Sequence, residues 1–253
     1  MTDTIVVAPH PDDEVLGAAE VLAGGPTTVV HVTDGVPPWV TGADREAMRD
    51  QRREESRAAW AELPARVETA VSMGYGDLTA WRNIAGIADR LCELVASGEG
   101  ARLYVPAYQR GHPDHDATYV AAHLARRRMM GRADVEWVVY GLYGFDHDHV
   151  ERFSWLTPTY YNGAEVRGAS GADLERKAAA LRRHRSQVRT DSVVQRWLDR
   201  PQPEAFSPLP ATSIPLPDLD CYYDEVFDFA SRGVSTAGAE AVVRQALAEA
   251  AAG

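Results

Sequence analysis

The sequence predicts an α/β protein, a three-layer sandwich in which helices cover both faces of a mostly parallel sheet. The first observation is that five short β-branched runs alternate with four helical patterns between residues 4 and 145. Such alternation is typical of parallel sheets joined by crossover helices. The second is that 45% of the 253 residues are hydrophobic, with no internal repeat. One large core, and hence one domain over 1–253, is therefore expected.

Apolar periodicity and turn residues place the first half of this alternation. A strand at 4–8 precedes a helical stripe that begins at Val15 and stops at Gly24-Gly25. A second strand at 28–32 ends at Thr33-Asp34-Gly35, and a long charged helix follows at 43–63.

The same signals continue to residue 145, where the predicted core 4–145 ends. A strand at 67–73 precedes a helix at 84–95, whose apolar residues recur at helical spacing before Ser97-Gly98. The last three predicted elements are a strand at 102–106, a helix at 116–129 and a strand at 135–142.

Residues 146–253 are expected to be an elaboration of this core. A basic helix is predicted at about 172–188. Six of the 15 prolines fall between Pro201 and Pro217, which indicates a long loop or lid. A strand at 222–229 and an Ala-rich helix at 238–252 complete the prediction.

Composition excludes several classes of partner and site. The formal charge of −11 and pI of 5.2 argue against nucleic acid or an anionic membrane, which require clustered Lys and Arg. Cys92 and Cys221 suggest neither a disulfide framework nor a thiolate metal site. The N-terminus lacks a basic region followed by a long apolar run, and no stretch could span a membrane, so a cytoplasmic protein is expected. Whether it forms a homo-oligomer stays open.

Two polar clusters follow predicted strands: His10-Pro11-Asp12-Asp13-Glu14 after the first, and His112-Pro113-Asp114-His115 after the fourth. In a doubly wound sheet of order 3-2-1-4-5, these strands are neighbours and a crevice opens at their carboxyl ends. The two clusters are therefore expected to meet there.

Imidazole and carboxylate together suit a borderline divalent metal, and a catalytic zinc usually takes three protein ligands. His10, Asp13 and His115 supply such a set. Asp12 is then the expected general base toward water activated by the metal. His112 is expected to donate to the developing oxyanion or to the leaving amine, with Asp114 holding its tautomer.

The two motifs also carry a resemblance. Residues 8–14, Ala-Pro-His-Pro-Asp-Asp-Glu, and 112–115, His-Pro-Asp-His, resemble the AHPDDE and HPDH signatures of the LmbE/PIG-L family of zinc N-deacetylases. Three further segments have residues spaced as they are in this family. The resemblance covers most of residues 4–190. These segments are Arg52-x-x-Glu55, Gly74-Tyr75-Gly76-Asp77, and Lys177 through Ser186-Gln187.

The resemblance implies a Rossmann-like fold, one zinc or iron(II), and hydrolysis of an N-acetyl group on a glucosamine conjugate or related small molecule. It makes Arg52 and Asp77 candidate substrate contacts. Arg110, a further candidate substrate contact, stands where some members carry a tyrosine that assists the oxyanion. His184 is a candidate for lining the site, against the alternative of a basic, solvated helix face.

Other interpretations of the sequence remain. Each aspartate of the two motifs could instead cap the helix that follows it, and 146–149, Asp-His-Asp-His, could be a polar loop or a second metal site. An amidase for a larger acyl or peptide-like amide would use the same metal. A non-catalytic nucleotide-binding protein is disfavoured, because the first β/α turn lacks the Gly-rich pattern that cradles phosphate.

Overall fold

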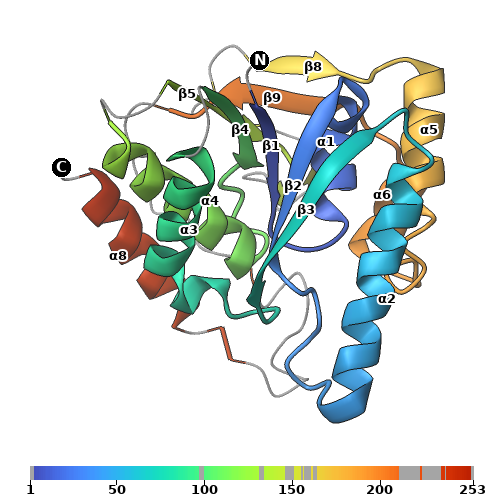
Figure 1. Cartoon of the computed structure of the whole chain (residues 1–253). Helices are drawn as coiled ribbons and strands as arrows, with labels where there is room; N and C mark the ends of the chain where they lie inside the picture. Colours follow the sequence, from blue (N-terminus) through green and yellow to red (C-terminus); the bar gives the residue numbers. More distant parts are fainter. Residues whose placement is uncertain are drawn as a thin grey trace.

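A seven-stranded sheet of order β3-β2-β1-β4-β5-β9-β8 forms the centre of the molecule (Figure 1). The computed structural model describes residues 3–96, 100–130, 134–145, 151–154, 156, 161, 164–210, 223, 235–236 and 238–251. Five strands are parallel: β1 (Asp3–Ala8), β2 (Pro26–Thr33), β3 (Arg66–Tyr75), β4 (Ala101–Pro106) and β5 (Val135–Tyr140). The predicted strand order 3-2-1-4-5 is confirmed.

The remaining strands are antiparallel. β9 (Glu204–Pro208) pairs with β5 on one side and with β8 (Glu165–Arg167) on the other. β6 (Tyr143–Phe145) and β7 (Glu151–Phe153) form a separate two-stranded sheet. The sheet is therefore mostly parallel, as predicted, with antiparallel strands at one edge.

Helices cover both faces of the sheet (Figure 1). One layer comprises α3 (Ile84–Ala96), α4 (Pro113–Arg128) and α8 (Ala239–Ala251), preceded by the short 3-10 helix η1 (Ala80–Arg82). The other comprises α1 (Asp13–Ala23), α2 (Gly42–Trp60), α5 (Gly171–Leu181) and α6 (Val193–Asp199). None of the helices in the described part of the chain combines the length and apolar character needed to cross a membrane.

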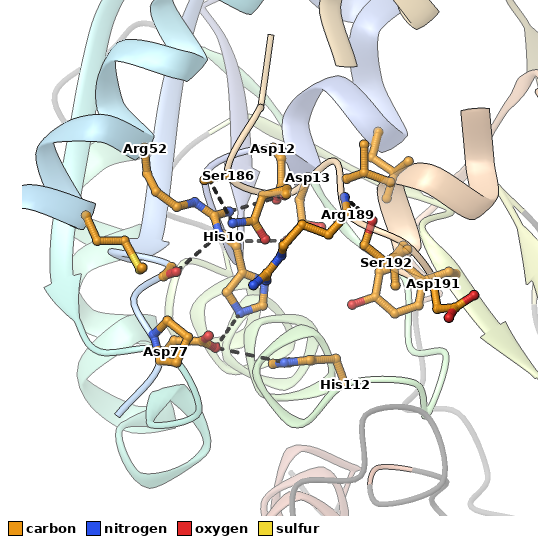
Figure 2. Close-up of a pocket in the computed structure, with 18 of the residues that line it drawn as sticks. His10, Asp12, Asp13, Arg52, Asp77, His112, Ser186, Arg189, Asp191 and Ser192 are labelled. Atoms are coloured by element: carbon orange, nitrogen blue, oxygen red, sulfur yellow. Dashed lines mark hydrogen bonds and ion pairs between the residues drawn. The ribbon is translucent and has the colours of Figure 1, made fainter. Parts of the chain in front are cut away.

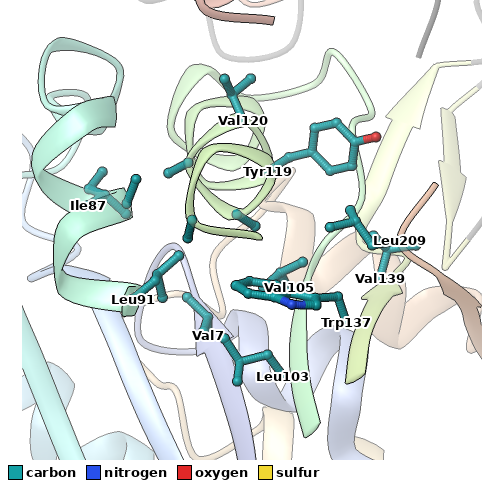
Figure 3. Close-up of a cluster of buried hydrophobic side chains, with 14 of the residues drawn as sticks. Val7, Ile87, Leu91, Leu103, Val105, Tyr119, Val120, Trp137, Val139 and Leu209 are labelled. Atoms are coloured by element: carbon teal, nitrogen blue, oxygen red, sulfur yellow. The ribbon is translucent and has the colours of Figure 1, made fainter. Parts of the chain in front are cut away.

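The core is split by the sheet into two apolar layers. Figure 3 shows the layer between the sheet and the helices α3 and α4. In it, Leu91 of α3 and Tyr119 of α4 lie over Val105 of β4 and Trp137 of β5. Alternate strand residues point to opposite faces, so Val6 belongs to the other layer. Burial on both faces explains the continuous apolar runs of the central strands β1, β4 and β5, whereas the edge strand β3 is largely exposed.

The C-terminal elaboration is anchored to α1 at a kink. Ala18 has non-helical angles of φ −143° and ψ 29°. The Glu204 carboxylate of β9 accepts hydrogen bonds from the freed N–H groups of Ala19 at 2.9 Å and Glu20 at 3.0 Å. Lys177 of α5 pairs with the same carboxylate at 2.9 Å, and both side chains are buried. The kink therefore couples α1 to α5 and β9.

Two predictions for the elaboration are corrected in part. The stretch 201–217 was expected to be a loop or lid, but 204–208 form β9 because Phe206 pairs with Tyr140 of β5, and 211–217 lie outside the described residues. The basic helix ends at Leu181 rather than at 188, and the chain continues in turns. The Asp-His-Asp-His segment at 146–149 and nearly all of the strand expected at 222–229 lie outside the described residues.

Candidate metal and catalytic site

The loops after β1 and β4 bring the two polar clusters together. Because β1 and β4 are adjacent and parallel, their carboxyl ends open at the same edge of the sheet. His112 is the N-cap of α4, and Pro113 occupies the first turn, where its missing N–H costs no hydrogen bond. The rings of His10 and His115, 105 residues apart in the chain, have centroids 5.1 Å apart.

Three ligand atoms converge in this cluster. Oδ2 of Asp13 lies 3.0 Å from Nδ1 of His10 and 3.1 Å from Nε2 of His115. The two nitrogens are 3.2 Å apart. Ligand atoms around a tetrahedral zinc with bonds of about 2.0–2.2 Å lie roughly 3.3–3.6 Å from one another. The spacing and the donor types therefore fit one divalent ion.

The other nitrogen of His10 faces two further carboxylates. Nε2 lies 3.2 Å from Oδ1 of Asp77 (Figure 2) and 3.4 Å from Oδ2 of Asp114. A carboxylate behind a ligating imidazole fixes its tautomer and raises its basicity. His10 is thus oriented to offer Nδ1 toward Asp13 and His115. His10, His112 and His115 also form a group whose ligand atoms all lie within 4.8 Å of one another, so His112 borders the same centre.

The electrostatics of the cluster favour a positive charge at its centre. Burial opposes protonation of His10, but the carboxylates of Asp114, Asp13 and Asp77 hold its pKa well above the ordinary value. Burial would raise the pKa of Asp13, yet His115 and His10 keep it well below its usual range. Carboxylates that favour the cationic form of a buried imidazole would likewise favour a bound cation.

Asp114 does not have the role that its position in the motif suggests. Its carboxylate accepts hydrogen bonds from the N–H groups of Leu78 at 2.6 Å and Ala80 at 2.9 Å. Nδ1 of His112 instead accepts the backbone N–H of Asp114 at 3.2 Å. The prediction that the Asp114 carboxylate fixes the His112 tautomer was wrong, because that carboxylate binds backbone N–H groups at the start of η1. The backbone of residue 114 has the tautomer-fixing role.

This hydrogen bond leaves Nε2 of a neutral His112 to carry the proton. Burial lowers the pKa of His112 well below its ordinary value, and the nearby His10 and His115 act in the same direction. Nε2 points toward Asp77, whose Oδ1 is 3.9 Å away. His112 is therefore a neutral hydrogen-bond donor beside the ligand cluster.

Asp12 lies next to Asp13 in the chain, and its side chain faces Arg52 of α2. Nη2 of Arg52 is 3.2 Å from Oδ2 of Asp12. Burial raises the pKa of Asp12 to about 7, with Arg52 acting in the opposite direction and Asp13 adding to the rise. A carboxylate whose pKa is close to neutral is well matched to general-base work.

A cavity of about 550 Å³ opens over the cluster. His10, Asp12 and Asp13 form its floor together with Asp77 and His112 (Figure 2). Its size is within the range of small-molecule sites. One part of the lining, the apolar wall, comprises Pro37, Trp39, Val40 and Met48. Another part is mostly polar and comprises 186–187 and 189–194, from the turns after α5 into the start of α6.

The four expected substrate contacts divide into two pairs. Arg52 and Asp77 line the cavity, although Arg52 is only 4% exposed. Arg110 and His184 are outside the lining among the described residues, and His184 is fully buried. The geometry therefore does not support substrate contact by Arg110 or His184. His184 is not on a solvated helix face either.

Sequence reasoning missed the buried network behind Asp12 and the apolar wall. Glu14 is fully buried and accepts hydrogen bonds from Trp60 Nε1 and from the Asp12 N–H, each at 3.0 Å. Nε2 of His31 lies 3.2 Å from the same carboxylate. Burial alone would raise the pKa of Glu14, but His31 keeps it below its ordinary value. The sequence did contain a signal for the apolar wall, because Trp39 is a large aromatic residue in the loop after the second strand.

The family model PIG-L, described as GlcNAc-PI de-N-acetylase, matches residues 5–125. None of the curated proteins compared with the chain matches it.

Three solved structures illustrate the likeness of the fold. A deacetylase of the teicoplanin biosynthesis pathway, in complex with teicoplanin, has a TM-score of 0.58 at 20% identity, over 82% of this chain and 97% of that chain. N,N'-diacetylchitobiose deacetylase from Pyrococcus horikoshii has a TM-score of 0.55 at 18% identity, over 78% and 74%. A conserved protein of Thermus thermophilus has a TM-score of 0.52 at 22% identity, over 86% and 99%.

Proposed function

Since residues 5–125 of this chain belong to the PIG-L family, we propose that the protein is a metal-dependent hydrolase. It removes an acetyl group from the nitrogen of an amino-sugar-containing small molecule or conjugate. The observation that carries this proposal is the convergence of His10, Asp13 and His115 within 3.2 Å of one another. Asp12 stands beside them on the floor of a cavity.

His10, Asp13 and His115 would hold the ion, and zinc or iron(II) suits this mixture of imidazole and carboxylate. When bound, such an ion polarises the amide carbonyl and lowers the pKa of a water molecule. Asp77 and Asp114 support the site by orienting His10 through its second nitrogen.

The remaining steps belong to side chains of this chain. Asp12 takes a proton from the attacking water, whose oxygen bonds to the amide carbon. The neutral His112 donates its Nε2–H to the carbonyl oxygen, where negative charge develops. The C–N bond then breaks, and the nitrogen receives the proton that Asp12 had taken. The products are acetate and a free amine.

The substrate class follows from the cavity and the relatives. The cavity, about 550 Å³, is much larger than an acetamido group needs. The solved relatives include enzymes that deacetylate N,N'-diacetylchitobiose and act in teicoplanin biosynthesis. An N-acetylated amino sugar, attached to a further group that occupies the cavity, is therefore the proposed substrate.

A second candidate function uses the apolar wall for the acyl group instead. Pro37, Trp39, Val40 and Met48 could contact a longer hydrocarbon chain, which would make the enzyme an amidase for larger acyl groups. If the wall accommodates the group attached to the sugar, turnover falls as the acyl chain lengthens. If it accommodates the acyl chain, turnover rises.

The test measures free amine released by metal-loaded protein from glucosamine derivatives with N-acetyl, N-butanoyl and N-octanoyl groups. Asp12→Asn should lower kcat by about 10²-fold or more, because a general base contributes about 10²–10⁴-fold. Asp199→Asn, which changes an aspartate on α6 outside the cavity lining, is the matched control. A near-normal rate in the Asp12 variant would contradict the proposed mechanism.

A further inference from the structure

The residue proposed as general base has a strained backbone. Asp12 has φ 143° and ψ −26°, immediately before the first residue of α1. A residue other than glycine in such a region is strained, and the conformation persists only where its surroundings enforce it. The contacts that enforce this conformation therefore decide where the Asp12 carboxylate points.

The peptide group between Pro11 and Asp12 is held at both of its polar ends. Its carbonyl oxygen accepts a hydrogen bond from Nη2 of Arg52, and its N–H donates to Oε2 of Glu14 at 3.0 Å. Arg52 is anchored further by donating Nη1 to the Gly35 carbonyl oxygen at 3.2 Å. Both contacts involve a buried charged group, and such hydrogen bonds are about twice as strong as neutral ones.

Little space is left for this peptide to move. A Cβ at Gly35 would lie 2.8 Å from Cδ of Pro11 and 2.9 Å from Cζ of Arg52. On the other side, Oε1 of Glu14 accepts the Trp60 Nε1–H at 3.0 Å and its Oε2 faces His31. Both anchoring side chains are therefore themselves fixed by neighbours.

We propose that Glu14, with Arg52, is a positioning residue that clamps the Pro11–Asp12 peptide and so aims the Asp12 carboxylate for proton transfer. Glu14 is fully buried and outside the cavity lining, so it acts through Asp12 rather than on the substrate. The catalytic consequence rests on the proposed function, whereas the clamp itself is a property of the fold. Misplacement of a reacting group by about 1 Å can cost about 10²-fold in rate.

Glu14→Gln tests the clamp because an amide has only one acceptor oxygen. If that oxygen takes the Asp12 N–H, the amide NH₂ faces the Trp60 N–H, and two donors oppose each other. If the amide turns, the Asp12 N–H loses its acceptor. Substituting Trp60 by Phe in addition removes the competing donor, so the double variant should regain the Asp12 hydrogen bond.

We expect Glu14→Gln to lower kcat by about 10- to 100-fold, with KM and bound metal close to wild type, and Glu14→Gln/Trp60→Phe to recover most of the loss. Glu204→Gln is the matched control, since Glu204 is another buried carboxylate that accepts α1 backbone N–H groups. It should lower stability and leave kcat unchanged. Normal kcat in Glu14→Gln, or no recovery in the double variant, would overturn the proposal.

A second readout does not depend on turnover. Hydrogen exchange of the Asp12 amide, followed by NMR, should accelerate in Glu14→Gln and slow again in the double variant. If wild-type protein hydrolyses no N-acyl substrate, the proposed function fails, while unchanged Asp12 exchange in Glu14→Gln would separately overturn the clamp. Should Glu14→Gln not fold, Gly35→Ala displaces the clamp from the Arg52 side, and normal kcat there would contradict the proposal.

Discussion

The fully buried His184 provides the sharpest prediction about stability and pH. Neither of its ring nitrogens has a hydrogen-bond partner among the described residues. Burial lowers the pKa of His184 to about 4, with the Glu14 carboxylate acting in the opposite direction. The imidazole is therefore neutral in the folded protein at pH 7, and its protonation opposes the native state.

The direction in which pH changes the stability follows from the pKa of His184 in the unfolded and in the folded protein. The unfolded chain binds a proton to this histidine below its ordinary pKa of about 6.5, whereas the folded protein binds it only near pH 4. The free energy of unfolding is therefore not reduced by this histidine above about pH 6.5. It decreases as the pH falls from about 6.5 toward 4, because the unfolded chain takes up the proton first. At 1.36 kcal/mol per pH unit, the difference between 6.5 and about 4 corresponds to about 3 kcal/mol.

Urea unfolding of wild type and His184→Leu between pH 4 and pH 8 measures this contribution. The difference in unfolding free energy between the two proteins should change by about 3 kcal/mol over this range, with wild type losing more stability on acidification. His123, whose pKa burial also lowers to about 4, is present in both proteins and cancels. A difference that does not vary with pH would refute the reasoning.

Three further predictions concern packing, charge and recognition. Gly17→Ala should lower the free energy of unfolding by about 1–3 kcal/mol, since its Cβ would lie 2.4 Å from the buried Tyr140 ring; a urea midpoint equal to wild type would contradict this. Lys177→Met should cost about 3–5 kcal/mol by leaving Glu204 buried without its cation, and adding Glu204→Gln should recover part of that loss in the same assay. Trp39→Ala should raise KM several-fold for an N-acetylglucosaminide with an apolar aglycone and little for the free sugar; equal changes would exclude Trp39 from recognising that group.

Much of the fold could be predicted because its signals are local. The five parallel strands and the first four helices are set by periodicity within short windows, and their alternation limits the topology. β9 was missed because its burial depends on pairing with β5, whose partner residues lie 66 to 70 positions earlier in the chain, while the nearby prolines indicate a loop. α5 was predicted too long because no Gly or Pro marks its end at Leu181.

The candidate site divides in the same way. His10, Asp13 and His115 could be placed together because the carboxyl ends of adjacent parallel strands meet. The role of Asp114 could not be predicted, because its carboxylate binds the backbone of residues 78 and 80. The pairing of Glu14 with His31 likewise depends on how α1 packs over β2, which no spacing within the motif encodes.

Elemental analysis of protein purified after loading with zinc or iron(II) tests the central claim most directly. His115→Ala is compared with His123→Ala, which changes another buried histidine of α4 outside the cavity lining. We predict about one ion per chain in wild type and in the His123 variant, and loss of the ion in the His115 variant. Absence of metal from the wild type, or full metal content in His115→Ala, would contradict the assignment of this site.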